Sequence, residues 1–255
     1  MSIVLSEWTK LRTLRSTLWS LLAAVLAMGG LGSIVAAVQM SRWSQLEPQE
    51  RLRYDAIDVG VGGYHLAQLA VGVLGVLVIT GEYSTGMIRS SLMAVPHRLP
   101  VLWAKIAVYG AVTFVLMLVA ALVSFFGVQA IVTQHGQAVT LAAPHALRAV
   151  IGTALFLTVM GILAIGLGTL VRNTAGGIAA FVGLLFVLPG VTALLPSSIS
   201  DAIGPYLPLN AAFTVATSTF EDPHHLATWT GFAVFCGYAA LFVAAAAVAL
   251  VRRDA

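Results

Sequence analysis

Long apolar runs alternate with short polar segments along the whole chain. Six runs carry few or no charged residues, and they cover about residues 17–38, 59–80, 102–132, 147–171, 176–195 and 226–251. An apolar stretch of about 18 residues or more is long enough to cross a bilayer as a helix. Apolar and polar positions do not alternate within the runs, so barrel strands are not indicated. The pattern predicts an all-α integral membrane protein: a single domain, residues 1–255, with six transmembrane helices.

The segment before the last run, residues 196–225, needs a separate interpretation. Residues 202–220 carry no charge and could form a seventh span. However, Gly204, Pro205 and Pro208 interrupt this stretch near its start, and proline removes a backbone donor from a helix. A seventh span would also place Arg252 and Arg253 outside the cell. We therefore expect an extracellular re-entrant or interfacial segment, and a kink at Pro189 in the fifth run.

Residues 1–16 mix apolar and basic positions and predict a separate helix. Its apolar face contains Val4, Trp8 and Leu11. The charged residues, which fall largely on the other side, are Glu7, Lys10, Arg12 and Arg15. This pattern is typical of a helix lying in the membrane interface. The same pattern also fits a positively charged flank that orients the first span in the membrane. Residues 1–16 can be an interfacial helix and such a flank at the same time. The first run exceeds the length of a signal-peptide core, so we expect a retained anchor.

The connection between the second and third runs, residues 82–105, is the most informative segment. Ser84 or Thr85 can cap a helix over residues 84–95, and Pro96 ends it. Ile88 and Leu92 belong to one apolar stripe of this helix. Such a helix could lie on the membrane face and fit a groove in a soluble partner. The alternative is a solvated loop that keeps its charged residues out of the lipid.

Charge supports six spans with both ends in the cytosol. This topology places nine of the 13 basic residues inside and four outside, the bias that membrane insertion favours. The inside residues are Lys10, Arg12, Arg15, Arg89, Arg98, Lys105, Arg172, Arg252 and Arg253. Overall, 59% of the residues are hydrophobic and 9% are charged, against about 25% charged in ordinary globular domains.

Several chemistries are disfavoured by what the sequence contains. We expect no acidic or basic residue at mid-span, which argues against a proton-driven pump or an intramembrane metalloprotease. His65 is expected to be a hydrogen-bonded interface residue, and the pair His224–His225 a solvated loop rather than a metal site. Neither Lys10 nor Lys105 stands in a phosphate-loop sequence, which needs Gly-Lys followed by Ser or Thr. Nucleotide energy would therefore come from a separate chain.

Two segments resemble a known family. Residues 7–16, EWTKLRTLRS, are similar to the opening of bacterial type-2 ATP-binding-cassette (ABC) exporter permeases, especially actinobacterial ones. Residues 81–89, GEYSTGMIR, followed by Pro96, Arg98 and Lys105, resemble that family's loop between the second and third spans. The pattern E-Y-x-x-G-x-x-R, then P-x-R and K, is fairly specific. Met87 stands where relatives often have Thr.

The resemblance implies a role for each segment. Residues 1–16 would be an elbow helix, with Glu7, Trp8, Lys10, Arg12 and Arg15 as its characteristic residues. Residues 84–95 would be a cytosolic coupling helix seated in an ABC ATPase subunit. The implied coupling residues are Glu82, Tyr83, Gly86, Ile88, Arg89, Leu92, Pro96, Arg98 and Lys105. Glu82 would lie at the inner membrane boundary, while Arg89, Arg98 and Lys105 could pair with acidic ATPase residues or lipid phosphates.

The resemblance also implies partners. Two permease copies, or two homologues, would join two ATPase subunits in a bacterial plasma membrane, and ATP and Mg would bind to the ATPase. This chain would bind no cofactor or metal and would have no catalytic residue of its own. The cargo would be an amphipathic or hydrophobic molecule such as a drug, peptide, lipid or natural product. The alternative to an exporter is a non-transporting scaffold or immunity protein.

Overall fold

The computed structural model describes residues 3–13, 15–87, 98–218 and 226–252. Within these ranges every regular element is a helix. Six helical segments are long and apolar enough to cross a membrane, which confirms the predicted number of spans. They are Thr17–Ser41, Ala56–Ser84, Leu99–His135, Ala146–Val171, Thr174–Thr192 and Thr228–Arg252.

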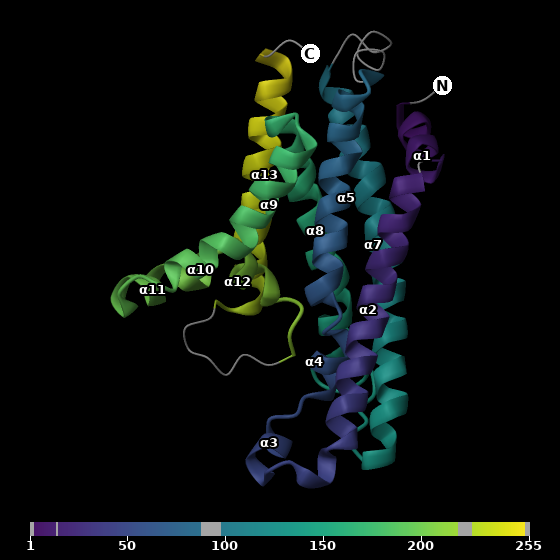
Figure 1. Cartoon of the computed structure of the whole chain (residues 1–255), viewed down its shortest axis with the longest axis vertical. Coiled ribbons are helices and arrows are strands. Elements are labelled where there is room, and N and C mark those ends of the chain that lie inside the picture. Colours follow the sequence, from purple (N-terminus) through teal and green to yellow (C-terminus); the bar gives the residue numbers. More distant parts are fainter. Residues whose placement is uncertain (1–2, 14, 88–97, 219–225, 253–255) are drawn as a thin grey trace.

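Four long helices and one helix pair build the bundle in Figure 1. The long helices are α2 (Arg15–Ser41), α7 (Arg98–Val132), α8 (Ala146–Val171) and α13 (Thr228–Arg252). The second span consists of α4 (Ala56–Val61) followed by α5 (Tyr64–Ser84). Helix α8 packs against α5, α7 and α13 and forms the centre of the core. Helix α2 closes the bundle on the side of α5 and α7.

Small residues allow α8 to approach its neighbours closely. A methyl group added at Gly161 would lie 2.4 Å from the ring of Tyr109, and one at Gly75 would lie 2.5 Å from the Gly161 carbonyl oxygen. The buried Tyr109 hydroxyl donates a hydrogen bond of 2.7 Å to the Val71 carbonyl. Close backbone contact and this hydrogen bond therefore hold α5, α7 and α8 together.

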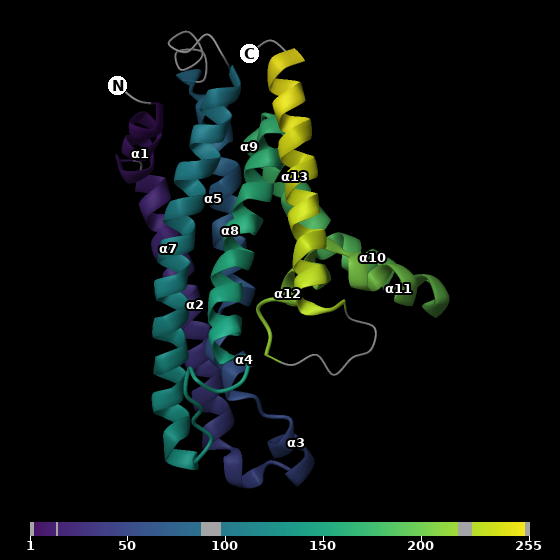
Figure 2. The ribbon, with the colours of Figure 1, turned by 180° about the vertical axis from the view of Figure 1, so that it is seen from behind.

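The fifth span leaves the bundle. It begins as α9 (Thr174–Val182), passes through a π-helical turn over Gly183–Val187, and continues as α10 (Leu188–Thr192). A π-helical turn is a recognised cause of a helix bend, and Pro189, which has no amide donor, is the second residue after it. Figures 1 and 2 show α10 and the next helix, α11 (Ser197–Ile203), leaning away from the other spans.

Short elements replace the possible seventh span. Helix α11 is followed by a 3₁₀ turn over Gly204–Tyr206 and by α12 (Pro208–Phe213), which packs on α13. None of these elements is long enough to cross a bilayer. Residues 219–225, with the pair His224–His225, lie outside the described residues.

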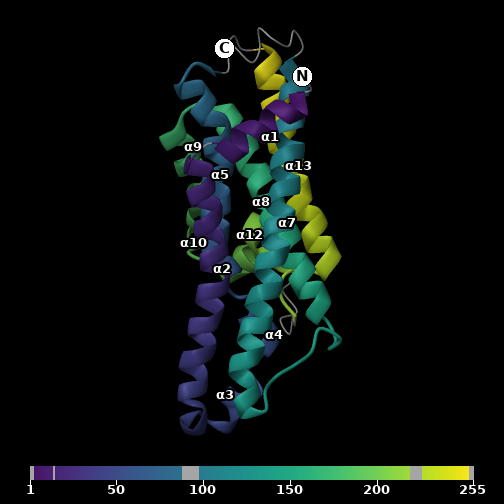
Figure 3. The ribbon, with the colours of Figure 1, turned by 90° about the vertical axis from the view of Figure 1, so that its right-hand side faces the viewer.

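The two ends of the bundle differ in composition. The first, called here the α1 end, contains α1 (Ile3–Thr13), the last turn of α5, the first turns of α7 and the end of α13 (Figure 1). Figure 3 shows α1 lying crosswise to α2 and α7. The second, the α3 end, contains the last turns of α2, the 3₁₀ turn Trp43–Gln45, α3 (Pro48–Leu52) and the last turns of α7 (Figure 1).

The connection predicted over residues 82–105 is shorter than expected. Helix α5 continues to Ser84 and α7 begins at Arg98, so Glu82 and Lys105 both lie within helices. A helix start at Ser84 or Thr85 is wrong, because both hydroxyls donate to the Gly81 carbonyl, at 3.0 and 2.8 Å, and Thr85 caps the end of α5. Gly86 follows with φ +70°, a left-handed conformation that glycine adopts readily.

Candidate functional site: an ion cluster beside the loop between α5 and α7

Four charged side chains from three helices meet at the α1 end. Helix α1 contributes Glu7 and Lys10, α5 contributes Glu82 near its last turn, and α7 contributes Lys105 two turns after its start. Lys10 Nζ lies 2.6 Å from Glu7 Oε1 and 2.7 Å from Glu82 Oε1. Lys105 Nζ lies 2.6 Å from Glu7 Oε2 and 2.9 Å from Glu82 Oε1. Each ammonium group therefore bridges both carboxylates.

The cluster is buried and electrically balanced. The side chain of Lys105 is 2% exposed and that of Lys10 is 21% exposed, while Glu7 and Glu82 are both buried. Two positive and two negative charges give a net charge of zero, which reduces the cost of removing them from water. Removing a fully buried member such as Lys105 would leave an uncompensated buried charge, at a cost of about 3–5 kcal/mol. The four residues therefore act as one unit.

The pKa of Lys10 shows how the cluster holds its charges. Burial alone would lower this pKa, but hydrogen bonds to Glu7 and Glu82 and the negative charges of both carboxylates outweigh burial. The result is a pKa raised above the usual 10.5, so Lys10 stays charged at neutral pH. Its contribution to stability is complete below about pH 10.5 and is lost as the pH rises through the raised pKa.

A second contact joins the ends of α5, α8 and α13 at the same end of the bundle. Arg172 follows α8 in a left-handed conformation with φ 58°. Its guanidinium carbon lies 5.3 Å from the ring centroid of Tyr83, and its Nη2 donates a hydrogen bond of 3.1 Å to the Ala249 carbonyl. Tyr83 and Glu82 are neighbours in α5, so the last turn of this helix is fixed on two sides.

The structure places the predicted elbow residues in two groups. Trp8 is partly exposed and lines a shallow apolar groove with residues of α7, and Arg12 is exposed. Glu7, expected on the side of the helix opposite the apolar face, is buried in the ion cluster, whereas Val4 and Trp8 of the apolar face are exposed. Nothing is described of the side chain of Arg15.

The predicted coupling residues divide in a similar way. Glu82, Tyr83 and Lys105 are brought together at the α1 end, and Gly86 ends the turn after α5. Lys105 was expected to pair with acidic ATPase residues or lipid phosphates; in this structure its ammonium group is buried against Glu7 and Glu82. The positions of Ile88, Arg89, Leu92 and Pro96, and the side chain of Arg98, lie outside the described residues.

Sequence reasoning missed the pairing across helices. Glu7 and Lys105 are 98 positions apart, and no local pattern joins them. One signal was present: a glutamate and a lysine stand where apolar helices begin or end, and membrane helices rarely contain a charged residue without a partner.

A second polar cluster lies on the α3 side of the core, where α4 meets the segment after α12. Asp58 Oδ1 accepts a hydrogen bond of 2.6 Å from the Ser218 amide, and the Ser218 hydroxyl donates to Asp55 Oδ2. Arg148 of α8 donates to the carbonyls of Thr217 and Ser218 and to the Thr228 hydroxyl, at 3.2, 2.8 and 2.6 Å. The cluster joins α4, α8 and the start of α13.

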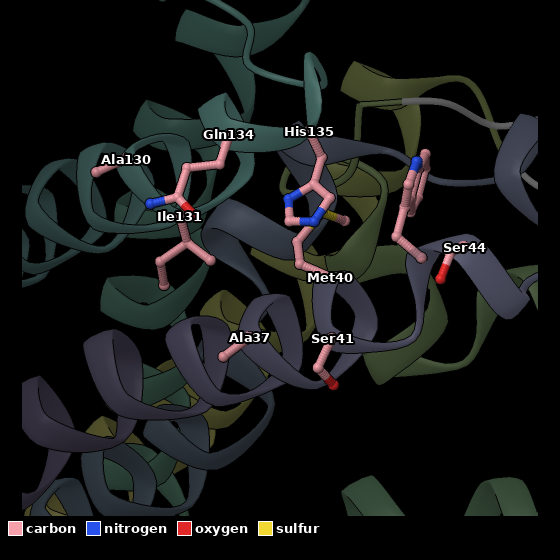
Figure 4. Close-up of a pocket in the computed structure, with 9 residues that line it drawn as sticks. Ala37, Met40, Ser41, Ser44, Ala130, Ile131, Gln134 and His135 are labelled. Atoms are coloured by element: carbon pink, nitrogen blue, oxygen red, sulfur yellow. The ribbon is translucent and has the colours of Figure 1, made fainter.

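A cavity of about 650 Å³ opens at the tip of the α3 end, between the last turns of α2 and α7. Figure 4 shows His135 and Gln134 on one side, with Ala37, Met40 and Ser41 of α2 on the other. Apolar and uncharged polar groups are mixed along its wall. Among the described residues, no group of three or more His, Cys, Asp or Glu side chains is arranged to hold a metal ion.

The fold defines a multi-span helical membrane protein whose N-terminal helix is fastened by charge to the two helices that flank residues 85–97. Residues 3–192 match the model of the ABC-2 family transporter proteins. This match covers well over half of the chain, so the protein belongs to that family, as its sequence resemblance indicated. It is a membrane transport subunit of ABC-2 type. No curated protein matches the sequence.

Proposed function

We propose that this chain is the membrane subunit of an ATP-driven exporter, powered by a separate ABC ATPase. The observation that carries the proposal is the ion cluster of Glu7, Lys10, Glu82 and Lys105. It connects α1 to both helices that flank residues 85–97, the segment expected to bind the ATPase. Family membership and the absence of a phosphate-loop sequence support the same conclusion.

The cluster suggests how movement would pass from the ATPase into the membrane. A force applied to residues 88–97 reaches α5 and α7 directly, because the segment is continuous with both helices. The ion cluster then makes α1 follow α5 and α7, since separating the helices would expose buried charges to an apolar environment. The ends of α1, α5 and α7 would therefore move as one body when the ATPase closes on ATP.

In the proposed arrangement the α1 end faces the bacterial cytosol, and both chain termini lie on that side. The excess of basic residues at this end supports the orientation. Two permease chains and two ATPase subunits would form the complete exporter, with ATP and Mg bound by the ATPase. The cargo would be an amphipathic or hydrophobic molecule, because the spans offer mainly apolar surface.

Site-specific crosslinking tests the docking surface. Photoreactive groups at Ile88 and Leu92 should capture the co-expressed ATPase, because the proposal places these residues in its groove. A photoreactive group at Leu52, which is exposed in α3 at the opposite end, is the matched control and should not capture it. Capture of lipid alone from positions 88 and 92 would remove the docking role and leave a non-transporting scaffold.

Charge reversal tests the coupling. Arg89→Glu should lower substrate-stimulated ATPase activity while expression and span insertion stay unchanged. Arg53→Glu, an exposed site near α3, serves as the control. Unchanged stimulation in Arg89→Glu would exclude this residue from the coupling set.

A further inference from the structure

A second cavity, of about 260 Å³, lies between α2 and the α4–α5 junction. Apolar side chains and glycines form most of its wall, and the two side chains with polar chemistry are Asp58 and His65. Both lie in the second span, where ionisable residues usually indicate a functional site. This cavity is distinct from the ion cluster, which lies at the other end of α5.

The position of the cavity along the span is defined by α5. Glu82 and His65 are 17 residues apart in this helix, which corresponds to about 26 Å along its axis. If Glu82 marks one edge of a hydrocarbon core of about 30 Å, His65 lies just inside the opposite edge. Asp58, one short helix earlier, lies close to the headgroup region. The cavity thus reaches from the membrane interface into the adjoining leaflet.

Asp58 supplies the acidic group of this cavity. Its Oδ1 accepts from the Ser218 amide, and the Ser218 hydroxyl, which donates to Asp55, also acts on the Asp58 carboxylate. The charged groups that act on Asp58 among the described residues are Asp55, which is negative, and Arg148, which is positive. Two carboxylates against one guanidinium leave an excess negative charge around Asp58, which is the acidic residue that lines the cavity.

His65 fixes the inner wall of the cavity. Its ring is exposed, and it lies 4.3 Å from the ring of Tyr64 and 5.4 Å from that of Phe213, measured between centroids. These ring contacts hold the imidazole in place. Its nitrogen atoms form no hydrogen bond to a described residue. The next residue in α5, Leu66, is an exposed apolar side chain.

We propose that this cavity binds the ammonium headgroup of a cationic amphipathic molecule, with the apolar chain directed along α5 toward the middle of the bilayer. This inference rests on the proposed function, for which it names the substrate class. The Asp58 carboxylate pairs with the ammonium group, and the apolar walls contact the first methylene groups. An anionic headgroup would meet the excess negative charge, and a divalent cation such as calcium needs about six oxygen ligands.

The size of the cavity agrees with a headgroup site. Pockets that enclose a whole drug-sized ligand measure about 300–1,000 Å³. A cavity of about 260 Å³ holds an ammonium group and a few carbon atoms, and the rest of the ligand remains outside. The same chemistry occurs in two sources, a transported amphipath and an aminophospholipid of the surrounding membrane, and the experiment separates them.

Binding to the purified permease, without the ATPase, tests the proposal. The probe is octyltrimethylammonium, titrated calorimetrically into protein in maltoside micelles, with uncharged octyl diethylene glycol ether as its comparator. Asp58→Asn keeps an acceptor for the Ser218 amide and removes the charge. We expect it to weaken binding of the cation roughly tenfold or more and to leave the neutral compound unaffected.

Two further variants keep the test decisive. His65→Lys places a positive charge in the cavity and should weaken cation binding to a similar extent, even if Asp58→Asn is poorly folded. Asp201→Asn, an exposed acid in α11, is the matched control and should bind like the wild type. Equal affinity in wild type, Asp58→Asn and His65→Lys, or an equal loss in Asp201→Asn, would overturn the site.

The source of the ligand follows from a lipid comparison. If phosphatidylethanolamine in nanodiscs competes with the probe for wild type but not for Asp58→Asn, the site takes a lipid headgroup. If phosphatidylethanolamine does not compete with the probe for wild type, the site takes the cargo. Both results support the ammonium site. ATPase capture at Ile88 is measured on the same preparation, so loss of the cavity site is distinguished from loss of the exporter function.

Discussion

The two polar clusters of the bundle use charge in different ways. At the α1 end, Lys10 and Lys105 pair with Glu7 and Glu82 through side chains alone, and the charges cancel. On the α3 side, Arg148 and Asp58 are bound largely through backbone groups of Thr217 and Ser218. The first arrangement joins three helices through side chains whose charges balance, whereas the second ties a short segment to two spans mainly through its backbone.

This difference suits the two ends to different tasks. In the proposed exporter, a neutral cluster would transmit movement, because any separation of its helices exposes uncompensated charge. A carboxylate beside a cavity can instead recognise a positively charged ligand. The variants below test the comparison, beginning with the largest expected effect.

Lys105→Met should have the largest effect on stability. It leaves Glu7 and Glu82 buried with one ammonium group between them, and we expect the free energy of unfolding to fall by about 3–5 kcal/mol. The measurement is thermal unfolding of the purified chain in detergent. Arg252→Met, at an exposed site in α13, is the control and should be nearly neutral.

The same cluster can be partly restored. Adding Glu7→Gln to Lys105→Met removes one unpaired negative charge, so the double variant should be more stable than Lys105→Met alone. If the double variant is less stable by the full sum of the two single effects, the four residues do not act as one unit.

Arg148→Met should have the next largest effect. It removes the donors to two carbonyl groups and the Thr228 hydroxyl, each worth about 0.5–1.5 kcal/mol, with partial compensation by water in this half-buried region. We expect a loss of about 1–3 kcal/mol in thermal unfolding. Arg53→Met, which is exposed near α3, serves as the comparison. A loss as large as that of Lys105→Met would contradict the difference between the clusters.

Lys10→Met should have a smaller effect and a distinct pH dependence. Lys10 is partly exposed, so water replaces some of the lost contacts, and we expect about 1–2 kcal/mol. In the wild type, Lys10 contributes fully below about pH 10.5 and loses its contribution as the pH rises through its raised pKa. The stability difference between wild type and Lys10→Met should therefore shrink in strongly alkaline solution. A difference that grows with pH would refute this assignment.

Ser218→Ala should have the smallest effect. The variant loses the hydrogen bond from the hydroxyl to Asp55, while the Ser218 amide still donates to Asp58. We expect a loss of about 0.5–1.5 kcal/mol in thermal unfolding. Thr217→Val, whose hydroxyl donates to the Phe213 carbonyl at 3.2 Å, is a suitable reference. A much larger loss would show that the side chain, rather than the backbone, carries this contact.

The sequence predicted the fold better than the site. The six spans were readable because an uncharged run of sufficient length has few other stable forms. The charge pattern of residues 1–16 predicted a separate helix, which α1 confirms. The same pattern failed for Glu7, because helical periodicity shows which residues share a face but not which neighbour covers that face.

The ion cluster shows the limit most clearly. Lys105 was assigned to an outside partner because it was expected in a loop, yet α7 begins at Arg98 and carries Lys105 into the bundle. The pairing of Asp58 also depends on packing, because α4 places it against Ser218, 160 positions away in the chain.

Amino-acid order alone determined the membrane class, the number of spans and the family of this protein, because hydrophobic length and short local motifs need no knowledge of neighbours. Tertiary structure alone decided which charges meet, which remain unpaired and which span departs from the bundle. The physical reason is that charge pairing depends on distances of a few ångströms between helices far apart in the chain. Those distances exist only after the helices have packed.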